Sequence, residues 1–103
     1  MVQISVDRES IEAFCNRWKI ARFALFGSVL HETFRPDSDV DVLVQFMPEA
    51  KYGLFDMVHM EKELKDIFGR EVDLVEWTEI ENSRNYIRRR AILGSAETIY
   101  AAR

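Results

Sequence analysis

The sequence predicts an α/β fold in which a sheet of three to four strands is packed against helices. Short runs of branched and aromatic residues, typical of buried strands, alternate along the chain with longer segments of helical periodicity. Glycine and proline lie between these segments, where turns and helix ends are expected. Such an alternation of strands and helices favours helices that cover a sheet.

The chain has the composition of an ordinary globular protein, 48% hydrophobic and 31% charged. Its 103 residues contain no repeat, low-complexity segment or linker, so we expect a single domain over residues 1–103. The net charge of −4 excludes a general nucleic-acid or membrane-surface binder, which needs a cationic face. Because no apolar run approaches about 18 residues and the N-terminus lacks a basic segment followed by an apolar one, we expect a cytoplasmic protein.

The first expected helix covers residues 8–19 and begins after Asp7, a suitable N-cap residue. Apolar side chains at helical spacing predict its buried face: Ile11, Phe14, Cys15 and Trp18. Cys15 is the only cysteine, which excludes an intrachain disulfide and a Cys-rich zinc site, and we interpret it as a buried thiol. Residues 20–26 are predicted to form a buried strand that ends at Gly27.

A short helix, a turn and a second strand are expected next. The helix covers residues 28–34 and opens at the preceding glycine. Pro36 marks the turn, which we expect Asp37 to shape as an Asx-type turn. The strand covers residues 40–46, a run rich in valine.

The second half of the chain contains the longest predicted helix, at residues 54–68. Its core face is predicted by apolar side chains at helical spacing: Met57, Met60, Leu64, Ile67 and Phe68. Gly69 is placed as its C-cap glycine. Three further elements follow: a strand at residues 70–76, a helix at residues 84–93 that ends at Gly94, and a short strand at residues 98–101.

Two acidic residues at the start of the second predicted strand share one face of the sheet. Asp39 and Asp41 are two positions apart, which places their Cα atoms about 6–7 Å apart on the same side. Two such carboxylates repel each other unless they share a cation, and carboxylate oxygens are ligands that Mg²⁺ prefers. Asp73 is a lone acid in the apolar third strand. If the two strands are neighbours, the three acids can hold two Mg²⁺ ions about 3.5–4 Å apart.

A phosphate site is predicted just upstream of these acids. Gly27 lets the backbone approach a phosphate closely, and the start of a short helix offers free N–H groups. The Ser28 hydroxyl adds a donor. A Gly-Ser pair occurs by chance in many chains, so it indicates a phosphate site only in combination with the acids that follow.

The combined pattern resembles the DNA polymerase β-like nucleotidyltransferase superfamily. It consists of Gly27-Ser28, ten intervening residues and Asp39-Val40-Asp41, followed later by Val-Asp-Leu-Val. The alternative is that the acids are solvated turn residues on an edge strand. The chain further resembles the minimal nucleotidyltransferases that act as MntA-like antitoxins beside HEPN-domain toxins, through five segments: LFGSVL, FRPDSDVDVLVQF, Gly-Leu-Phe opening a helix, LKDIFGREVDLV and NYIRRRAILGSAETIYA.

This resemblance implies a small mixed sheet of the nucleotidyltransferase fold and transfer of AMP from Mg-ATP to a tyrosine hydroxyl of a HEPN ribonuclease toxin, which silences the toxin. It implies a hetero-oligomer with that toxin. It also implies that Gly27 and Ser28 bind phosphate, that Asp39 and Asp41 bind both metal ions, and that Asp73 binds the catalytic one. At His31, three positions after the serine, many relatives carry a basic residue, often arginine, so a triphosphate contact from this position is not expected.

Two other functions are compatible with the pattern. The protein could neutralise a toxin by binding alone, or it could modify a small molecule such as an aminoglycoside, a chemistry that the superfamily also hosts. Modification of a small molecule is the function that we expect least, because the catalytic core takes up nearly all of the 103 residues.

A few residues outside the pattern also attract attention. Arg88, Arg89 and Arg90 are interpreted as a solvated face, with a phosphate or an acidic partner as the alternative. Tyr52 could stack on adenine, although exposed loop aromatics are common. Trp77 is a candidate interface residue, and His59 is expected to face solvent.

Overall fold

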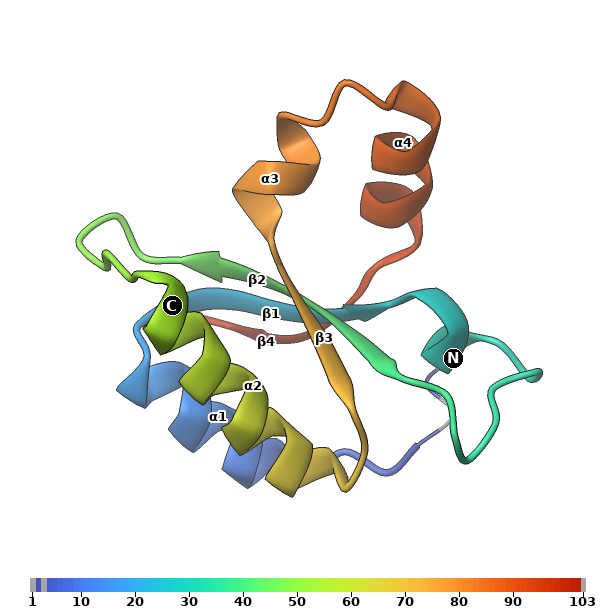
Figure 1. The fold of residues 1–103 in the computed structure, drawn as a ribbon, viewed down its shortest axis with the longest axis horizontal. Helices are drawn as coiled ribbons and strands as arrows, with labels where there is room; N and C mark the ends of the chain where they lie inside the picture. Colours follow the sequence, from blue (N-terminus) through green and yellow to red (C-terminus); the bar gives the residue numbers. More distant parts are fainter. Residues whose placement is uncertain (1, 3, 103) are drawn as a thin grey trace.

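The structure, a computed structural model, describes residue 2 and residues 4–102 and confirms the α/β prediction. A four-stranded mixed sheet crosses the molecule, with helices on both of its faces (Figure 1). The sheet order is β3-β2-β1-β4, where β2 and β3 are parallel and the other pairs are antiparallel. The strands are β1 (Ile20–Phe26), β2 (Val40–Phe46), β3 (Val72–Glu76) and β4 (Glu97–Ala101).

Two pairs of helices cover opposite faces of this sheet (Figure 1). One face packs against α1 and α2, and the other against α3 and α4. A 3₁₀ helix, η1, continues directly from β1. The helices are α1 (Arg8–Arg17), η1 (Gly27–Leu30), α2 (Leu54–Phe68), α3 (Trp77–Glu81) and α4 (Tyr86–Ser95).

Strand β2 contributes to both layers because its side chains alternate between the faces. Val40, Val42 and Val44 are fully buried in the larger core cluster, together with side chains of α1 and α2. Leu43 instead belongs to the smaller cluster, which contains the buried side chains of α3 and α4. By the same alternation, Asp41 lies on the face of Leu43.

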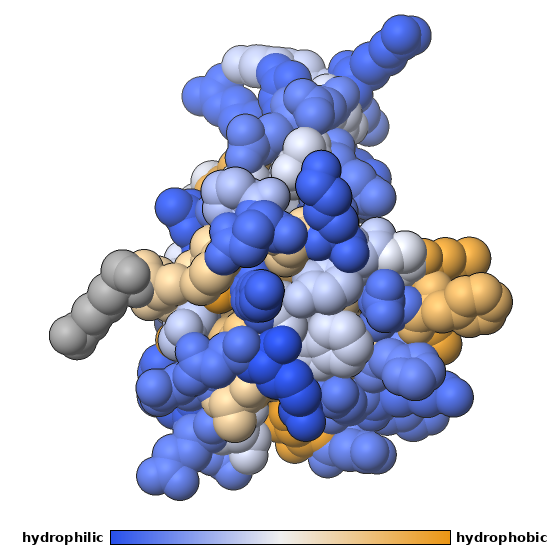
Figure 2. Space-filling view, turned by 90° about the vertical axis from the view of Figure 1, so that its left-hand side faces the viewer, coloured by the Kyte–Doolittle hydropathy of each residue, from blue (hydrophilic) through white to orange (hydrophobic). Residues whose placement is uncertain are grey.

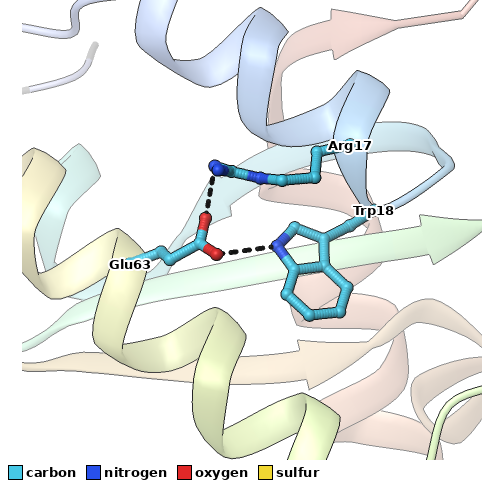
Figure 3. Close-up of polar contacts among 3 residues, drawn as sticks. All are labelled: Arg17, Trp18 and Glu63. Carbon is cyan, nitrogen blue, oxygen red and sulfur yellow. Dashed lines mark hydrogen bonds and ion pairs between the residues drawn. The ribbon is translucent and has the colours of Figure 1, made fainter.

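The two helices of the larger layer are joined by polar contacts as well as by the core (Figure 3). Glu63 of α2 accepts from Arg17 Nη2 at 2.5 Å and from Trp18 Nε1 at 3.3 Å, with one carboxylate oxygen for each donor. Asp7 caps α1 as predicted, since its side chain accepts from the Ser10 N–H. These contacts fix the layer on which the valines of β2 pack.

The predicted segment boundaries hold closely for β1, β2 and α2, and less well near the glycines and prolines. The helix expected at residues 28–34 is a 3₁₀ helix that ends at Leu30, because His31 adopts an extended backbone. Four residues is a usual length for this tighter and less stable helix. Gly94 does not end the last helix, which continues to Ser95, where the serine hydroxyl donates to the Ala91 carbonyl.

Two further features differ from the prediction. The helix α3 was not predicted, since five residues with a single buried side chain, Ile80, give too short a pattern for helical periodicity. In the turn after η1, Ser38 Oγ accepts from the Arg35 N–H at 3.1 Å, and Arg70 Nη1 donates to the carbonyls of Arg35 and Pro36. Among the described residues, the Asp37 side chain makes no hydrogen bond in this turn. The expected Asx-type turn at Asp37 was therefore wrong. A serine closes the turn in its place.

Among the described residues, no helix is long and apolar enough to cross a membrane.

Candidate active site

The structure places Asp41 and Asp73 directly opposite each other on neighbouring strands. β2 and β3 pair in parallel, and Asp41 is the register partner of Asp73. Adjacent strands lie about 4.8 Å apart, so the two residues occupy one row across the sheet. This confirms that the third strand lies beside the second.

Gly27 lies against the other side of Asp41. Phe26, the last residue of β1, is the register partner of Asp41, and Gly27 follows with a positive φ of 75°. A Cβ atom at this glycine would lie 2.3 Å from the Asp41 Oδ2 atom. The glycine is therefore needed for its backbone conformation and also for the space that the carboxylate occupies. The sequence predicted a glycine that approaches phosphate, but no sequence signal revealed its contact with Asp41.

The surroundings of Asp41 disfavour its negative charge. Partial burial, followed by the neighbouring charges of Asp73 and then Asp39, raises the pKa of Asp41 to about 6. The side chains of Asp39 and Asp73 are exposed to solvent. The sheet thus holds one half-buried carboxylate between two solvated ones.

The donor set fits a hard divalent cation. Carboxylate oxygens are its preferred ligands, and a cation would offset the repulsion that raises the Asp41 pKa. Within residues 2 and 4–102, no group of three or more His, Cys, Asp or Glu side chains has the arrangement of a metal site. The backbone register therefore places Asp41 beside Asp73, and the side chains would have to rotate for the three acids to share an ion.

Ser28 lies in the first turn of η1, next to the glycine, and its side chain is exposed. Its carbonyl accepts from the His31 N–H, which closes the short helix at 3.0 Å. His31 is exposed just beyond this helix. The serine side chain is therefore accessible, one residue beyond the glycine that lies against Asp41.

A hollow of about 550 Å³ lies at the other end of β2. It is lined by the end of that strand, the following loop and the starts of α2 and α3. Figure 2 faces this end of the molecule, where most exposed side chains are hydrophilic. Tyr52 lines the hollow, but its hydroxyl donates to the Trp18 carbonyl at 2.6 Å and its ring packs edge-on against Trp18 and Phe46. The geometry therefore favours a structural role for Tyr52 over adenine stacking.

Residues 7–93 match the family model of the nucleotidyltransferase domain. This match includes Gly27, Ser28 and the three aspartates, so the chain belongs to the nucleotidyltransferase domain family.

Sequence relatives come from the archaeon Methanocaldococcus jannaschii and are described as candidate protein adenylyltransferases. MJ0435 is 36% identical over 61 residues, which cover 59% of this chain and 63% of the relative. MJ1217 is 30% identical over 66 residues, which cover 64% of this chain and 65% of the relative. The chain thus matches somewhat less than two thirds of the length of these relatives.

Solved structures share the fold. A candidate minimal nucleotidyltransferase is 30% identical, with a TM-score of 0.65 and coverage of 87% of this chain and 86% of that one. A toxin–antitoxin crystal structure with AMP-PNP has a TM-score of 0.71 at 17% identity, and the match covers 95% of this chain and 76% of that one. An MNT antitoxin complex with the tri-AMPylated HEPN toxin of Shewanella oneidensis has a TM-score of 0.63 at 16% identity, covering 92% and 70%. The fold class of minimal nucleotidyltransferases is thereby established.

Proposed function

We propose that this protein is an antitoxin that transfers AMP from ATP to a tyrosine hydroxyl of a HEPN-domain ribonuclease toxin and so neutralises it. The observation that carries the proposal is the row formed by Gly27, Asp41 and Asp73 across three adjacent backbone segments. The family match and the toxin–antitoxin neighbours support the choice of reaction and of partner.

The placement of the residues supports the following binding roles. Ser28 and the N–H groups at the start of η1 would orient the phosphates of ATP at the end of β1. Asp39 and Asp41 would hold two Mg²⁺ ions, and Asp73 would hold the ion on the acceptor side. Bound Mg²⁺ supplies the positive charge that neutralises the phosphates and polarises the α-phosphate.

The remaining chemistry requires little more than position and charge. The tyrosine oxygen attacks the α-phosphorus, a new P–O bond forms, and the bond to the β-phosphate breaks, so that pyrophosphate leaves. Asp73 is exposed at the edge strand, where its carboxylate oxygen can take the proton of the incoming hydroxyl. This step matters because the unperturbed pKa of tyrosine is about 10.

The direct test is to incubate the protein with the HEPN-domain partner, ATP and Mg²⁺ and to weigh the partner by intact-mass spectrometry. The expected result is a mass increase of whole AMP units that disappears with a chelator. Asp39→Ala with Asp41→Ala should abolish it. Asp37→Ala, which removes an exposed acid in the neighbouring turn, is the matched control and should keep it. An unmodified partner under all conditions would contradict the enzyme proposal.

Neutralisation by binding alone is the second candidate, favoured by neighbours that are complexes of antitoxin with toxin. It predicts that the variant lacking Asp39 and Asp41 still protects cells from the toxin. We also propose that residues 1–103 form a single catalytic domain that acts in the cytoplasm, where ATP is available.

A further inference from the structure

Positive charge is concentrated in α4 and in the residues just before it, although the chain has a net charge of −4. Residues 82–96 include four arginines and no acidic residue. Within the described part of the chain, none of the four forms an ion pair. Arg84 and Arg88 are exposed, and the structure gives their side chains no polar partner among these residues. This local charge is therefore available to an anionic surface.

Apolar side chains lie among these arginines. Ile87 is 79% exposed and Tyr86 is 57% exposed. Arg90 lies three positions after Ile87 on α4, and Arg84 lies just before the N-cap residue of this helix, Asn85. We call Arg84, Tyr86, Ile87, Arg88 and Arg90 the arginine face.

The arginine face is partly preorganised. Arg90 Nη1 donates to the Tyr86 hydroxyl at 3.3 Å, and the Arg89 guanidinium lies 5.4 Å from the centre of the Tyr86 ring. Arg89 Nη1 also donates to the Ser83 carbonyl at 3.2 Å. Tyr86 is thus held between two arginines, which lowers the entropy lost when a partner orders this surface.

The helix α4 lies on the side of the sheet that carries the acids. Its buried residue Ile92 packs in the cluster that contains Leu43 and Phe26. Asp41 lies on the face of Leu43 by strand alternation, and Figure 1 shows α4 on this side, opposite α1 and α2. A protein bound to the arginine face would therefore approach the sheet from the side of Asp41 and Asp73.

We propose that the arginine face is the docking surface for the protein that carries the acceptor tyrosine, through an acidic patch with an apolar centre. This inference rests on the proposed function for the identity of the partner. Uncompensated arginines around an exposed aliphatic side chain match such a patch, because arginine and large apolar residues dominate protein–protein interfaces. RNA binding would use aromatic stacking, and it is disfavoured because the Tyr86 ring already lies against Arg89 and its hydroxyl accepts from Arg90.

The test measures the affinity of the HEPN-domain partner by calorimetry at low and at high salt. Ile87→Asp should weaken binding at least about tenfold, since it places a charge at the apolar centre of the interface. Arg84→Glu with Arg88→Glu should weaken binding to a similar degree, most strongly at low salt. Leu54→Asp is the matched control, because Leu54 is 78% exposed at the start of α2, and it should bind as the wild type does. Circular dichroism and affinity for Mg-ATP verify that each variant is folded.

The outcomes separate docking from catalysis. If the wild type binds the partner through the arginine face but transfers no AMP, the proposed function fails and the docking surface stands. If the wild type transfers AMP and Ile87→Asp keeps the same affinity and the same KM for the partner, the docking proposal is wrong. The docking proposal is also wrong if the wild type does not bind the partner, or if Leu54→Asp loses as much affinity for the partner as Ile87→Asp does. It is wrong as well if Arg84→Glu with Arg88→Glu keeps its affinity for the partner and loses only affinity for single-stranded RNA.

Discussion

The two faces of strand β2 differ in chemistry, since valines and an aspartate alternate along it. Toward α1 and α2, Val40, Val42 and Val44 are fully buried, and their burial stabilises the fold. Toward α3 and α4, Asp41 lies beside Asp73 with its pKa raised by burial and by like charges. One face stabilises the protein, and the other carries an arrangement that is unfavourable without a cation. A strand whose valines are fixed in the core can thus carry a destabilising pair of acids, the candidate site, on its opposite face.

The largest expected effect on the acid face comes from Asp73→Asn. Because this substitution keeps the shape and removes the charge, AMP transfer should fall at least about a hundredfold while the thermal unfolding temperature changes little. Intact-mass measurements over time determine the rate. Asp37→Asn, in the exposed turn, is the control and should keep the wild-type rate. Equal rates for both variants would remove Asp73 from the site.

Gly27→Ala should separate the two roles of this glycine. The positive φ alone is expected to cost about 1–2 kcal/mol of unfolding free energy, and the added Cβ atom also displaces the Asp41 carboxylate. Gly69→Ala is a matched control, since Gly69 has a φ of 68° and no atom within 4 Å of the Cβ position. Both variants should lose similar stability in urea titrations, but only Gly27→Ala should lose transfer. Full activity of Gly27→Ala would show that the position of Asp41 is unimportant.

A substitution on the core face should have the opposite signature. Val42→Ala removes two methyl groups from a fully buried site and should lower the unfolding free energy by about 2 kcal/mol. Transfer per folded molecule should be retained when measured well below the unfolding temperature. A large loss of transfer with unchanged stability would contradict the division of β2 into two faces.

The smallest effect is a dependence of stability on pH in buffer without Mg²⁺. The pKa of Asp41 is raised from 3.8 to about 6 in the folded protein, so the folded state holds a proton that the unfolded state has released. Stability should therefore fall as the pH rises from about 4 to 6. Since the group is only partly buried, we expect on the order of 1 kcal/mol after solvent screening. Chemical denaturation across this range, with Asp41→Asn as the control that removes the slope, measures the effect.

Much of the fold could be predicted because strand and helix patterns are local. The bounds of β1, β2 and α2 follow from runs of branched residues, helical spacing and the C-cap glycine, Gly69, whose φ is positive. The sequence analysis left open whether the third strand lies beside the second, and the register of Asp41 with Asp73 shows that it does. What could not be predicted depends on contacts across the sheet or on very short elements. The packing of Gly27 on Asp41 and the stacking of Arg22 on Trp77 at 4.5 Å join residues far apart in sequence.

One variant with two measurements can show whether Asp41 serves chemistry and not stability. Asp41→Asn is compared with the wild type by urea denaturation without Mg²⁺ and by AMP transfer to the HEPN-domain partner with Mg²⁺ and ATP. We expect an unfolding free energy equal to or higher than that of the wild type and a loss of transfer of at least about a hundredfold. A variant that is less stable, or that transfers AMP at the wild-type rate, would contradict this expectation.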